Sequence, residues 1–462
     1  MKIIIAGGGK VGLALVQQLA AEGHDLTLID ASNAVLQSAV ERYDTMTTQG
    51  NCASMQVLKS AGAEGADLLI AVTDADEVNL LCCMTAHGMN KHLHTIARIR
   101  NPEYAQQVMT MQDVFPLSLT VNPERRAALE IERLLKFPGF LRRDTFAKGR
   151  AQIVELRISK DSKLANIPLR DMNSTVKCRV LVCAVLRAGE AVAPSGDFIL
   201  CEGDRIFVTA PTADLSILLK NLDIATSRVR KVLLCGGGRV SYYLAALLAK
   251  DGISVQLLDK NYDRCVELAS LLPDTSVIHG DCSSQTTLEA QGITDMDAVV
   301  SLTGMDETNM IISLYAMKRG VKQVITNLSR GVTSNIADSL SLGSVICPKD
   351  LCSNDIVRYV RAMQNQTGAA ISLHTIADGQ AEAVEFLIDP AAKGCGVPLK
   401  QLKLKKNLLI ANITHGADTA IPNGESVFLP GDTVVVVTSG RGVLKQFNDI
   451  FAQKTPSDRS LL

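Results

Sequence analysis

Short apolar runs alternate with amphipathic stretches from the first residues of the chain. The run 2–6 leads into a glycine-rich stretch, a helix-like pattern and a second apolar run, 26–30, which ends in an acid. We expect further strands near 45–47, 68–72, 95–98 and 118–121, and helices near 35–43, 54–61, 78–87 and 102–109. Strands that alternate with helices at this spacing predict an α/β fold with a doubly wound parallel sheet, which binds ligands at the carboxyl ends of its strands.

The chain repeats this pattern in its second half. Gly236, Gly238 and Asp259 lie 229 residues after Gly7, Gly9 and Asp30. Asp281 and Cys282 lie 230 residues after Asn51 and Cys52. A register held over this length indicates two tandem copies. We therefore expect two Rossmann-like parallel sheets, each followed by a small β-rich α+β module.

The boundaries follow from the same patterns. We expect the first sheet domain at 1–122, a connecting helix at 123–150 and the first small module at 151–222. The second copy is expected as 229–347, 348–372 and 373–455, with a hinge at 226–230 and a frayed tail at 455–462. The helical stretches that begin at Pro123 and Pro348 either cover their own sheet or exchange between the two domains.

The first glycine-rich stretch has the form of a dinucleotide-binding turn. Gly7, Gly9 and Gly12 give the G-x-G-x-x-G spacing, with Lys10 and Val11 between the last two. The first glycine allows the tight turn, the second lets the backbone approach a pyrophosphate and the third lets helix and strand pack closely.

Asp30, at the end of the second strand, is placed to accept hydrogen bonds from a ribose diol. A 2′-phosphate about 4 Å from this carboxylate would be repelled by about 4 kcal/mol. No arginine follows Asp30 to offset that repulsion, because the next residues are Ala31 and Ser32. The sequence therefore favours NAD(H) over NADP(H).

The second copy departs from this pattern at one position. Its turn contains Gly236, Gly238, Arg239 and Val240, but Ser241 replaces the third glycine. A side chain there should loosen the packing of helix against strand. We therefore expect the second site, with Asp259 as its acid, to bind weakly or to bind a different nucleotide.

Polar residues at the ends of other strands are further candidates. Asn51 and Cys52, and their counterparts Asp281 and Cys282, follow the third strands, where they either contact an adenine or form a simple turn. Thr73, Asp74 and Glu77 follow the fourth strand. They either face the ligand or cap a helix, since Thr73 with Asp76 has the spacing of a capping box.

Arg98 and Arg100 close the fifth strand. Side chains along a strand point alternately to its two faces, so residues 98 and 100 have their guanidinium groups on the same face of the sheet. There they either contact phosphate or form a solvated edge. Arg100 has a counterpart in Arg330, whereas Leu328 replaces Arg98 in the second copy.

Composition narrows the function classes. The net charge is −1, so no overall field attracts nucleic acid or an anionic membrane. Aromatic residues are 4% with no Trp, which argues against a base-stacking surface.

No apolar run is long enough to span a bilayer, and we expect no separate signal region before the first strand. The 12 cysteines form no C-x-x-C pair, so reduced thiols in the cytosol are expected and no metal site.

Two dinucleotide folds, each followed by a small module, and the run Thr73-Asp-Ala-Asp-Glu-Val-Asn79 together resemble the peripheral NAD-binding subunits of Trk potassium-uptake systems, built from RCK domains. The resemblance covers the whole chain. It implies a cytoplasmic ring, commonly a homotetramer, docked on the inner face of the membrane beneath a potassium-translocating integral membrane subunit. It also implies a protein that binds NAD(H), and possibly ATP or ADP, and gates transport without catalysis.

Carried over to this sequence, the resemblance assigns the NAD site to Gly7, Gly9, Gly12 and Asp30, and basic phosphate-facing positions to Arg98 and Arg100. The sequence departs from the family at Asn51, where Asp is usual, and at Ser241. The alternative from another class is an NAD-dependent oxidoreductase acting on a small molecule. That reading needs a positioned acid–base group and a substrate domain, and the sequence displays neither. A free-standing redox sensor is a third interpretation.

Overall fold

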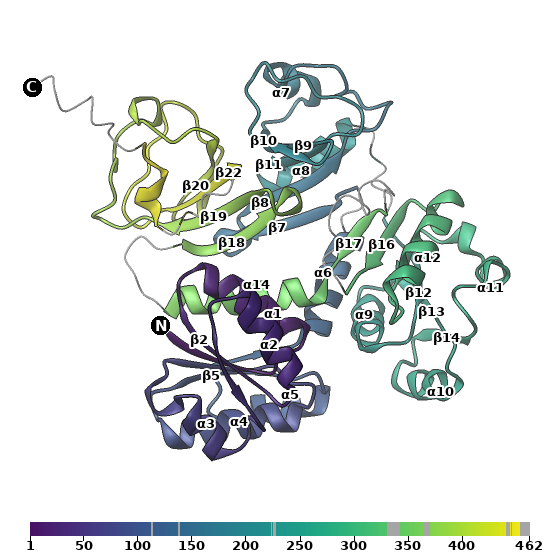
Figure 1. The fold of residues 1–462 in the computed structure, drawn as a ribbon. Coiled ribbons are helices and arrows are strands. Elements are labelled where there is room, and N and C mark those ends of the chain that lie inside the picture. Colours follow the sequence, from purple (N-terminus) through teal and green to yellow (C-terminus); the bar gives the residue numbers. More distant parts are fainter. Residues whose placement is uncertain are drawn as a thin grey trace, which may run out of the picture.

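The computed structural model describes residues 1–111, 114–136, 139–222, 224, 228–329, 342–363, 370–439, 444 and 446–452. Arg330, residues 226–227 of the expected hinge and the expected tail lie outside these ranges. The described ranges form four sheets, whose arrangement is shown in Figure 1. Two are parallel and two are antiparallel, in alternating order along the chain, as the repeat predicts.

The first parallel sheet has the order β3-β2-β1-β4-β5-β6. Its strands are β1 (Lys2–Ala6), β2 (Asp25–Asp30), β3 (Met46–Gln49), β4 (Leu68–Ala71), β5 (His94–Arg98) and β6 (Leu119–Val121). Its helices are α1 (Lys10–Ala21), α2 (Asn33–Arg42), α3 (Met55–Ser60), α4 (Asp76–Met89) and α5 (Pro102–Thr110). The strand order reverses between β1 and β4, which is where doubly wound sheets bind nucleotides.

The central strands appear in the sequence as continuous apolar runs because helices cover both faces of this sheet. Ile3 and Ile5 of β1 belong to one core cluster, while Ile4 and Ala6 belong to the cluster on the opposite face. A strand buried on both sides has no exposed positions to alternate, so it reads as a continuous apolar run.

The second parallel sheet repeats the first with the order β14-β13-β12-β15-β16-β17. Its strands are β12 (Lys231–Cys235), β13 (Ser254–Asp259), β14 (Thr275–His279), β15 (Ala298–Ser301), β16 (Gln323–Asn327) and β17 (Ser344–Ile346). Its helices are α9 (Arg239–Lys250), α10 (Tyr262–Leu271), α11 (Gln285–Ala290) and α12 (Asp306–Lys318).

Each small module is built on a five-stranded antiparallel sheet, β10-β9-β11-β8-β7 in the first and β18-β19-β22-β20-β21 in the second. The first contains β7 (Arg142–Phe146), β8 (Ala151–Arg157), β9 (Leu181–Arg187), β10 (Glu190–Val192), β11 (Arg205–Thr209), α7 (Met172–Val176) and α8 (Thr212–Asn221). The second contains β18 (Ala370–Ile376), β19 (Ala381–Leu387), β20 (Leu408–His415), β21 (Asp418–Ala420) and β22 (Thr433–Ser439). The two sheets share one core cluster, in which Phe207 and Ala184 pack with Ala383 and Val435.

Strand β7 lies inside the range 123–150 that the sequence assigns to a connecting helix. Its polar run Arg142-Arg143-Asp144 hides the strand from a hydrophobic pattern search, but it pairs with β8 along its whole length. Strand β18 likewise begins inside the range 348–372 and pairs with β19. We therefore propose that the modules begin at residues 142 and 370.

The helices between sheet and module exchange between the two copies. Helix α6 (Pro123–Lys136) follows the first sheet but buries Ile131 and Leu135 in the core of the second, beside Leu234 and Leu244. Helix α14 (Pro348–Met363) follows the second sheet and buries Ile356 and Val360 in the core of the first. Figure 1 shows α14 beside α1 and α6 beside α9. We call α6 and α14 the exchange helices.

None of the helices in the described ranges combines the length and hydropathy that a bilayer crossing requires.

Candidate nucleotide sites

The first glycine turn joins β1 to α1 and is left-handed at its first residue, with Gly7 at φ +105°. A Cβ on Gly7 would lie 2.9 Å from the backbone nitrogen of Thr73, and one on Gly12 would lie 1.9 Å from the carbonyl oxygen of Gly7. A Cβ on Gly9 would meet no atom within 4 Å. Gly7 and Gly12 are therefore required by packing inside the protein, while Gly9 leaves space from which a ligand could approach the helix N-terminus.

Asp30 is held in one orientation beside this turn. Its Oδ2 accepts a hydrogen bond from the backbone N–H of Gly8 at 2.7 Å, and its Oδ1 accepts one from that of Ser32 at 2.8 Å. Each carboxylate oxygen has a further lone pair. The side chain can therefore still accept hydrogen bonds from a ribose diol without moving.

The second glycine turn has the same backbone form. Gly236 has φ +111°, and Asp259 accepts hydrogen bonds from the N–H groups of Gly237 at 2.5 Å and Asn261 at 2.8 Å. The loosening expected at Ser241 is not seen. That side chain is fully buried, and its hydroxyl donates a hydrogen bond to the carbonyl of Gly236. Arg239 and Val240 begin α9 as Lys10 and Val11 begin α1.

Arg264 at the second turn was missed by sequence reasoning. Its Nε donates a hydrogen bond to the carbonyl of Gly237 at 2.8 Å. The residue 229 positions earlier is Val35, whose Cγ1 would lie 2.4 Å from a Cβ on Gly8. The second turn therefore carries a guanidinium where the first carries an apolar side chain. Comparing the two copies position by position would have revealed it.

The residues after β4 have structural roles that the capping interpretation did not predict. Asn79 is fully buried, and its Oδ1 accepts hydrogen bonds from the N–H of Thr73 at 2.8 Å and from its hydroxyl at 2.7 Å. Its amide donates to the carbonyl of Arg98 at 2.9 Å. Asn309 makes the corresponding contacts in the second copy. Asn79 thus ties the β4–α4 turn to the end of β5.

The capping-box prediction for Thr73 and Asp76 is wrong. The residue at the N-cap of α4 is Ala75, and no side chain caps it. Asp76 is buried and accepts hydrogen bonds from the backbone N–H groups of Arg100 and Asn101, both at 2.7 Å. It therefore fixes the chain that follows β5 and does not cap its own helix.

Arg98 and Arg100 both reach the β4–α4 turn, consistent with their expected common side. The guanidinium of Arg98 pairs with Asp74 at 2.9 Å, and that of Arg100 donates to the carbonyl of Asp74. The carboxylate of Glu77 accepts a hydrogen bond from the hydroxyl of Tyr104 at 2.9 Å. A backbone hydrogen bond and this hydroxyl lower the pKa of Glu77.

The residues after the third strands form local turns. Asn51 accepts a hydrogen bond from the N–H of Ala53 at 3.0 Å, and Asp281 accepts one from that of Ser283 at 2.8 Å. Both side chains are exposed, whereas Cys52 and Cys282 are buried. These hydrogen bonds agree with the prediction of a simple turn. Of the four side chains, the exposed Asn51 and Asp281 are the ones that a ligand can reach. Within the described ranges, no three His, Cys, Asp or Glu side chains come together as metal ligands.

The fold and these two turns define a class of protein with tandem nucleotide-type sheets, each followed by a small antiparallel module. Comparison with known families identifies the chain further. The TrkA-N domain matches residues 3–114 and 232–348, and the TrkA-C domain matches residues 153–223 and 383–452. The chain therefore belongs to the TrkA family.

Relatives agree with this assignment over nearly their whole length. The chain is 30% identical to the Trk system potassium uptake protein TrkA homolog 1 of Methanosarcina mazei, covering 94% of this chain and 97% of the relative. It is 29% identical to the Trk system potassium uptake protein TrkA of Haemophilus influenzae, with 98% of both chains covered. These relatives are named for a transport system and not for an enzyme activity.

Solved structures share the fold. The GsuK channel bound to NAD matches with a TM-score of 0.58 and 17% identity, covering 95% of this chain and 76% of that one. The GsuK RCK domain matches with a TM-score of 0.59 and 16% identity, covering 95% and 92%. The expected fold, two Rossmann-like sheets each followed by a small module, is thereby confirmed.

Proposed function

We propose that this protein is a regulatory subunit that binds NAD(H) at the first glycine turn and gates a potassium-translocating membrane protein. The observation that carries the proposal is the reciprocal exchange of α6 and α14. Because each exchange helix is part of the core of the other copy's sheet, a change in one nucleotide domain displaces a helix that leads directly into a small module. A ligand then acts by preferring one relative arrangement of the domains.

A direct contact between the two nucleotide domains supports this coupling. Tyr243 lies on α9, the helix that begins at the second glycine turn. Its hydroxyl donates a hydrogen bond to the carbonyl of Arg100 at 2.8 Å and accepts one from Asn122 at 3.1 Å. Arg100 is anchored on the first ligand edge, so the contact joins that edge to the helix of the second site.

We assign the two nucleotide sites to the residues around the two turns, where the exposed members contact the ligand and the buried Gly12, Cys52, Ser241 and Cys282 shape the turns. In the first copy these are Gly7, Gly9, Lys10, Val11, Gly12, Asp30, Asn51, Cys52, Thr73, Asp74, Glu77, Arg98 and Arg100. In the second they are Gly236, Gly238, Arg239, Val240, Ser241, Asp259, Asp281 and Cys282. Gly9 and Gly238 leave room for the pyrophosphate, Asp30 and Asp259 accept hydrogen bonds from ribose, and Arg98 and Arg100 are the cations that we propose for phosphate.

The second site carries cations that the first lacks. Arg264 donates a hydrogen bond to the carbonyl of Gly237 and pairs with Glu267 at 2.6 Å, and Lys260 follows Asp259 where Ala31 follows Asp30. Lys260 suits a nucleotide that carries more negative charge there, such as ADP or ATP. In this proposal NAD(H) occupies the first site and an adenine nucleotide the second.

The working assembly we propose is a cytoplasmic homotetrameric ring, peripheral on the inner face of the membrane and docked to its potassium-translocating subunit. The relatives' names place those proteins in potassium uptake systems, which supports such a partner. The nucleotide acts there as a regulator and is released without chemical change. A scan of NADH absorbance against a metabolite panel tests this last point, since useful turnover would favour the oxidoreductase alternative.

A thermal-shift panel of NAD, NADH, NADP, ATP and ADP tests the binding part of the proposal. We expect NAD or NADH to raise the melting temperature of the full chain, and NADP to do so much less because of Asp30. Pulldown from membranes with and without NAD(H) then tests the partner. A chain indifferent to all five nucleotides would overturn the proposal.

A further inference from the structure

Two exposed aromatic side chains lie beside the second glycine turn. Tyr262 is the first residue of α10 and is 64% exposed, and His279 is the last residue of β14 and is also exposed. Their ring centroids lie 5.6 Å apart, and the ring planes are nearly perpendicular at 84°. An edge-to-face pair uses at most one face of each ring, so the tyrosine ring keeps a face that a ligand can cover.

This pair is held next to the acid of the second site. Asp259 is the register partner of His279 in the sheet. The Nε2 of His279 donates a hydrogen bond to the carbonyl of Lys260 at 3.1 Å, since a carbonyl oxygen can only accept. The backbone N–H of Asn261, which immediately precedes Tyr262, donates one to Asp259 at 2.8 Å. Both rings are therefore attached to the backbone around the carboxylate that we assign to ribose.

The first copy has no aromatic side chain at either position. Asn33 is the first residue of α2, where α10 begins with Tyr262. Gln49 ends β3, where β14 ends with His279. The amide of Gln49 donates a hydrogen bond to the carbonyl of Ala31 at 3.2 Å, so it repeats the backbone contact of the histidine without supplying a ring. The aromatic pair is therefore an addition made in the second copy.

The opposite half of each sheet shows the reverse difference. In the first copy Arg98, at the end of β5, pairs with Asp74 at 2.9 Å. Gly304 and the fully buried Leu328 stand 230 residues later, so the second copy cannot form this ion pair. A dinucleotide covers both halves of such a fold, whereas a mononucleotide covers one. The second copy thus adds side chains at the adenosine half only, which favours a mononucleotide such as ADP or ATP.

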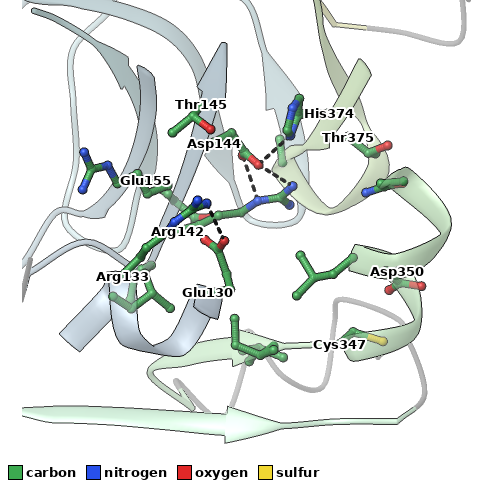
Figure 2. Close-up of a pocket in the computed structure, with 18 of the residues that line it drawn as sticks. Glu130, Arg133, Arg142, Asp144, Thr145, Glu155, Cys347, Asp350, His374 and Thr375 are labelled. Atoms are coloured by element: carbon green, nitrogen blue, oxygen red, sulfur yellow. Dashed lines mark hydrogen bonds and ion pairs between the residues drawn. The ribbon is translucent and has the colours of Figure 1, made fainter. Parts of the chain in front are cut away.

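An aromatic contact between the two modules serves as a comparison, because it has a structural role. The rings of Phe146 and His374 meet edge to face with centroids 4.6 Å apart, and both side chains are buried. As Figure 2 shows, the ring of His374 also points to Asp144, which accepts a hydrogen bond from it at 2.9 Å. Tyr262 has no such cover, so packing inside the protein does not explain an aromatic residue there.

We propose that the open face of Tyr262 stacks on the adenine of a nucleotide in the second site, and that His279 holds the tyrosine ring in place. This proposal rests on our assignment of an adenine nucleotide to that site. The base is bonded to the ribose carbon beside the hydroxyls that Asp259 binds, so it lies within reach of side chains around that acid. The exposed Asp281 can accept a hydrogen bond from the exocyclic amine of adenine. Hydrogen bonds from Ser283 lower the pKa of Asp281, so its carboxylate is ionised at neutral pH.

Titration calorimetry of ADP on the full chain carrying Asp30→Ala tests the proposal, because this background removes the first site and leaves the second. Adding Tyr262→Ala should weaken ADP binding roughly fivefold to a hundredfold, since stacking on an aromatic ring contributes about this much to the binding of a base. Tyr262→Phe keeps the ring face and should bind ADP within about twofold of the background chain. Val266→Ala is the matched control, since Val266 is exposed about one turn further along the same helix.

UDP is the second probe, because it carries the same ribose and diphosphate as ADP with a smaller base. The background chain should bind ADP more tightly than UDP, and Tyr262→Ala should narrow this difference. A general loosening of the site would weaken both nucleotides alike. Tyr262 is exposed, so the substitution should leave the midpoint of denaturant unfolding unchanged.

Three results would overturn the stacking role: unchanged ADP affinity in Tyr262→Ala, an unchanged ratio of ADP to UDP affinity in that variant, or an equal loss of ADP affinity in Val266→Ala. A background chain that binds no ADP would overturn the assignment of an adenine nucleotide to the second site, and this proposal with it. None of these results bears on NAD(H) at the first turn, which the NAD thermal shift of the parent chain reports separately.

Discussion

Both carboxylate oxygens of Asp30 accept backbone hydrogen bonds before any ligand is present. The site is therefore pre-organised, and a ribose diol has only to add its own hydrogen bonds. We expect Asp30→Ala to abolish the NAD-induced rise in melting temperature and to weaken NAD binding by at least about tenfold. Titration calorimetry with NAD measures the second effect.

Asp259→Ala is the matched control for that variant, because Asp259 has the same two backbone contacts at the second turn. It should leave most of the NAD response intact. The reverse order of effects would place the main NAD site at the second turn and contradict our assignment.

Asn79 illustrates a residue whose role is structural although it lies at the ligand edge. It is fully buried and joins the β4–α4 turn to β5. Asn79→Ala would leave buried backbone groups unpaired, so we expect the free energy of unfolding of the first sheet domain to fall by about 2 to 4 kcal/mol. Denaturant unfolding measures this, and Glu77→Gln, at an exposed carboxylate, should change it by less than about 0.5 kcal/mol. An unaffected Asn79→Ala protein would contradict this structural role.

For single residues, the sequence predicts the roles that depend on nearby residues of the chain. The spacing of Gly7, Gly9 and Gly12 and the position of Asp30 define the site, because all four belong to one continuous strand–turn–helix–strand unit. The role of Asn79 was not predictable, since its partner at Arg98 comes from another strand. Arg264 was readable only by comparison with Val35 in the other copy.

At the scale of elements, the exchange helices decide which sheet each stretch of sequence stabilises. Ile131 of α6 is buried in the core of the second sheet and Ile356 of α14 in that of the first. We therefore expect crossed effects. Ile131→Ala should destabilise the second sheet and Ile356→Ala the first, each by about 2 to 5 kcal/mol. Hydrogen exchange measured by mass spectrometry resolves the two sheets.

The two isoleucine variants serve as controls for each other, because both side chains are fully buried on equivalent helices. Faster exchange in β1 and β4 after Ile356→Ala, with β12 and β15 unchanged, is the expected pattern. Destabilisation of the sheet that precedes each helix in the sequence would contradict the exchange.

The amphipathic pattern of these helices gave their first residues and their apolar face, but the ranges 123–150 and 348–372 extended past their ends and their partner was not predicted. An apolar stripe fits either of two nearly identical sheets, so only the packed structure distinguishes covering from exchange. Strand β7 was missed for a different reason, since its residues Arg142 and Asp144 pair with each other and give the strand no hydrophobic pattern.

At the scale of the whole molecule, the pair of Asp144 and His374 joins the two modules. Burial of Asp144 raises its pKa, but the charges of Arg142 and His374 outweigh this and hold the pKa well below its ordinary value of 3.8. The carboxylate therefore stabilises the folded state fully above about pH 4 and progressively less as pH falls through its lowered folded pKa.

Asp144→Asn tests this contribution. At neutral pH the variant should unfold at lower denaturant concentration than the parent chain, and the difference between them should shrink below about pH 4. Unfolding titrations at pH 7, 5 and 3 measure it. A difference that is constant with pH would show that Asp144 acts by packing and not by charge.

The central claim is that nucleotide binding at the first turn changes potassium transport without chemistry. Potassium flux through the cognate membrane subunit, reconstituted in vesicles with this chain, tests it most directly. We expect NAD or NADH to change the flux with the parent chain, and to have no effect with Asp30→Ala under the same conditions. Flux that is the same with and without nucleotide, or that responds equally in the Asp30→Ala variant, would contradict the claim.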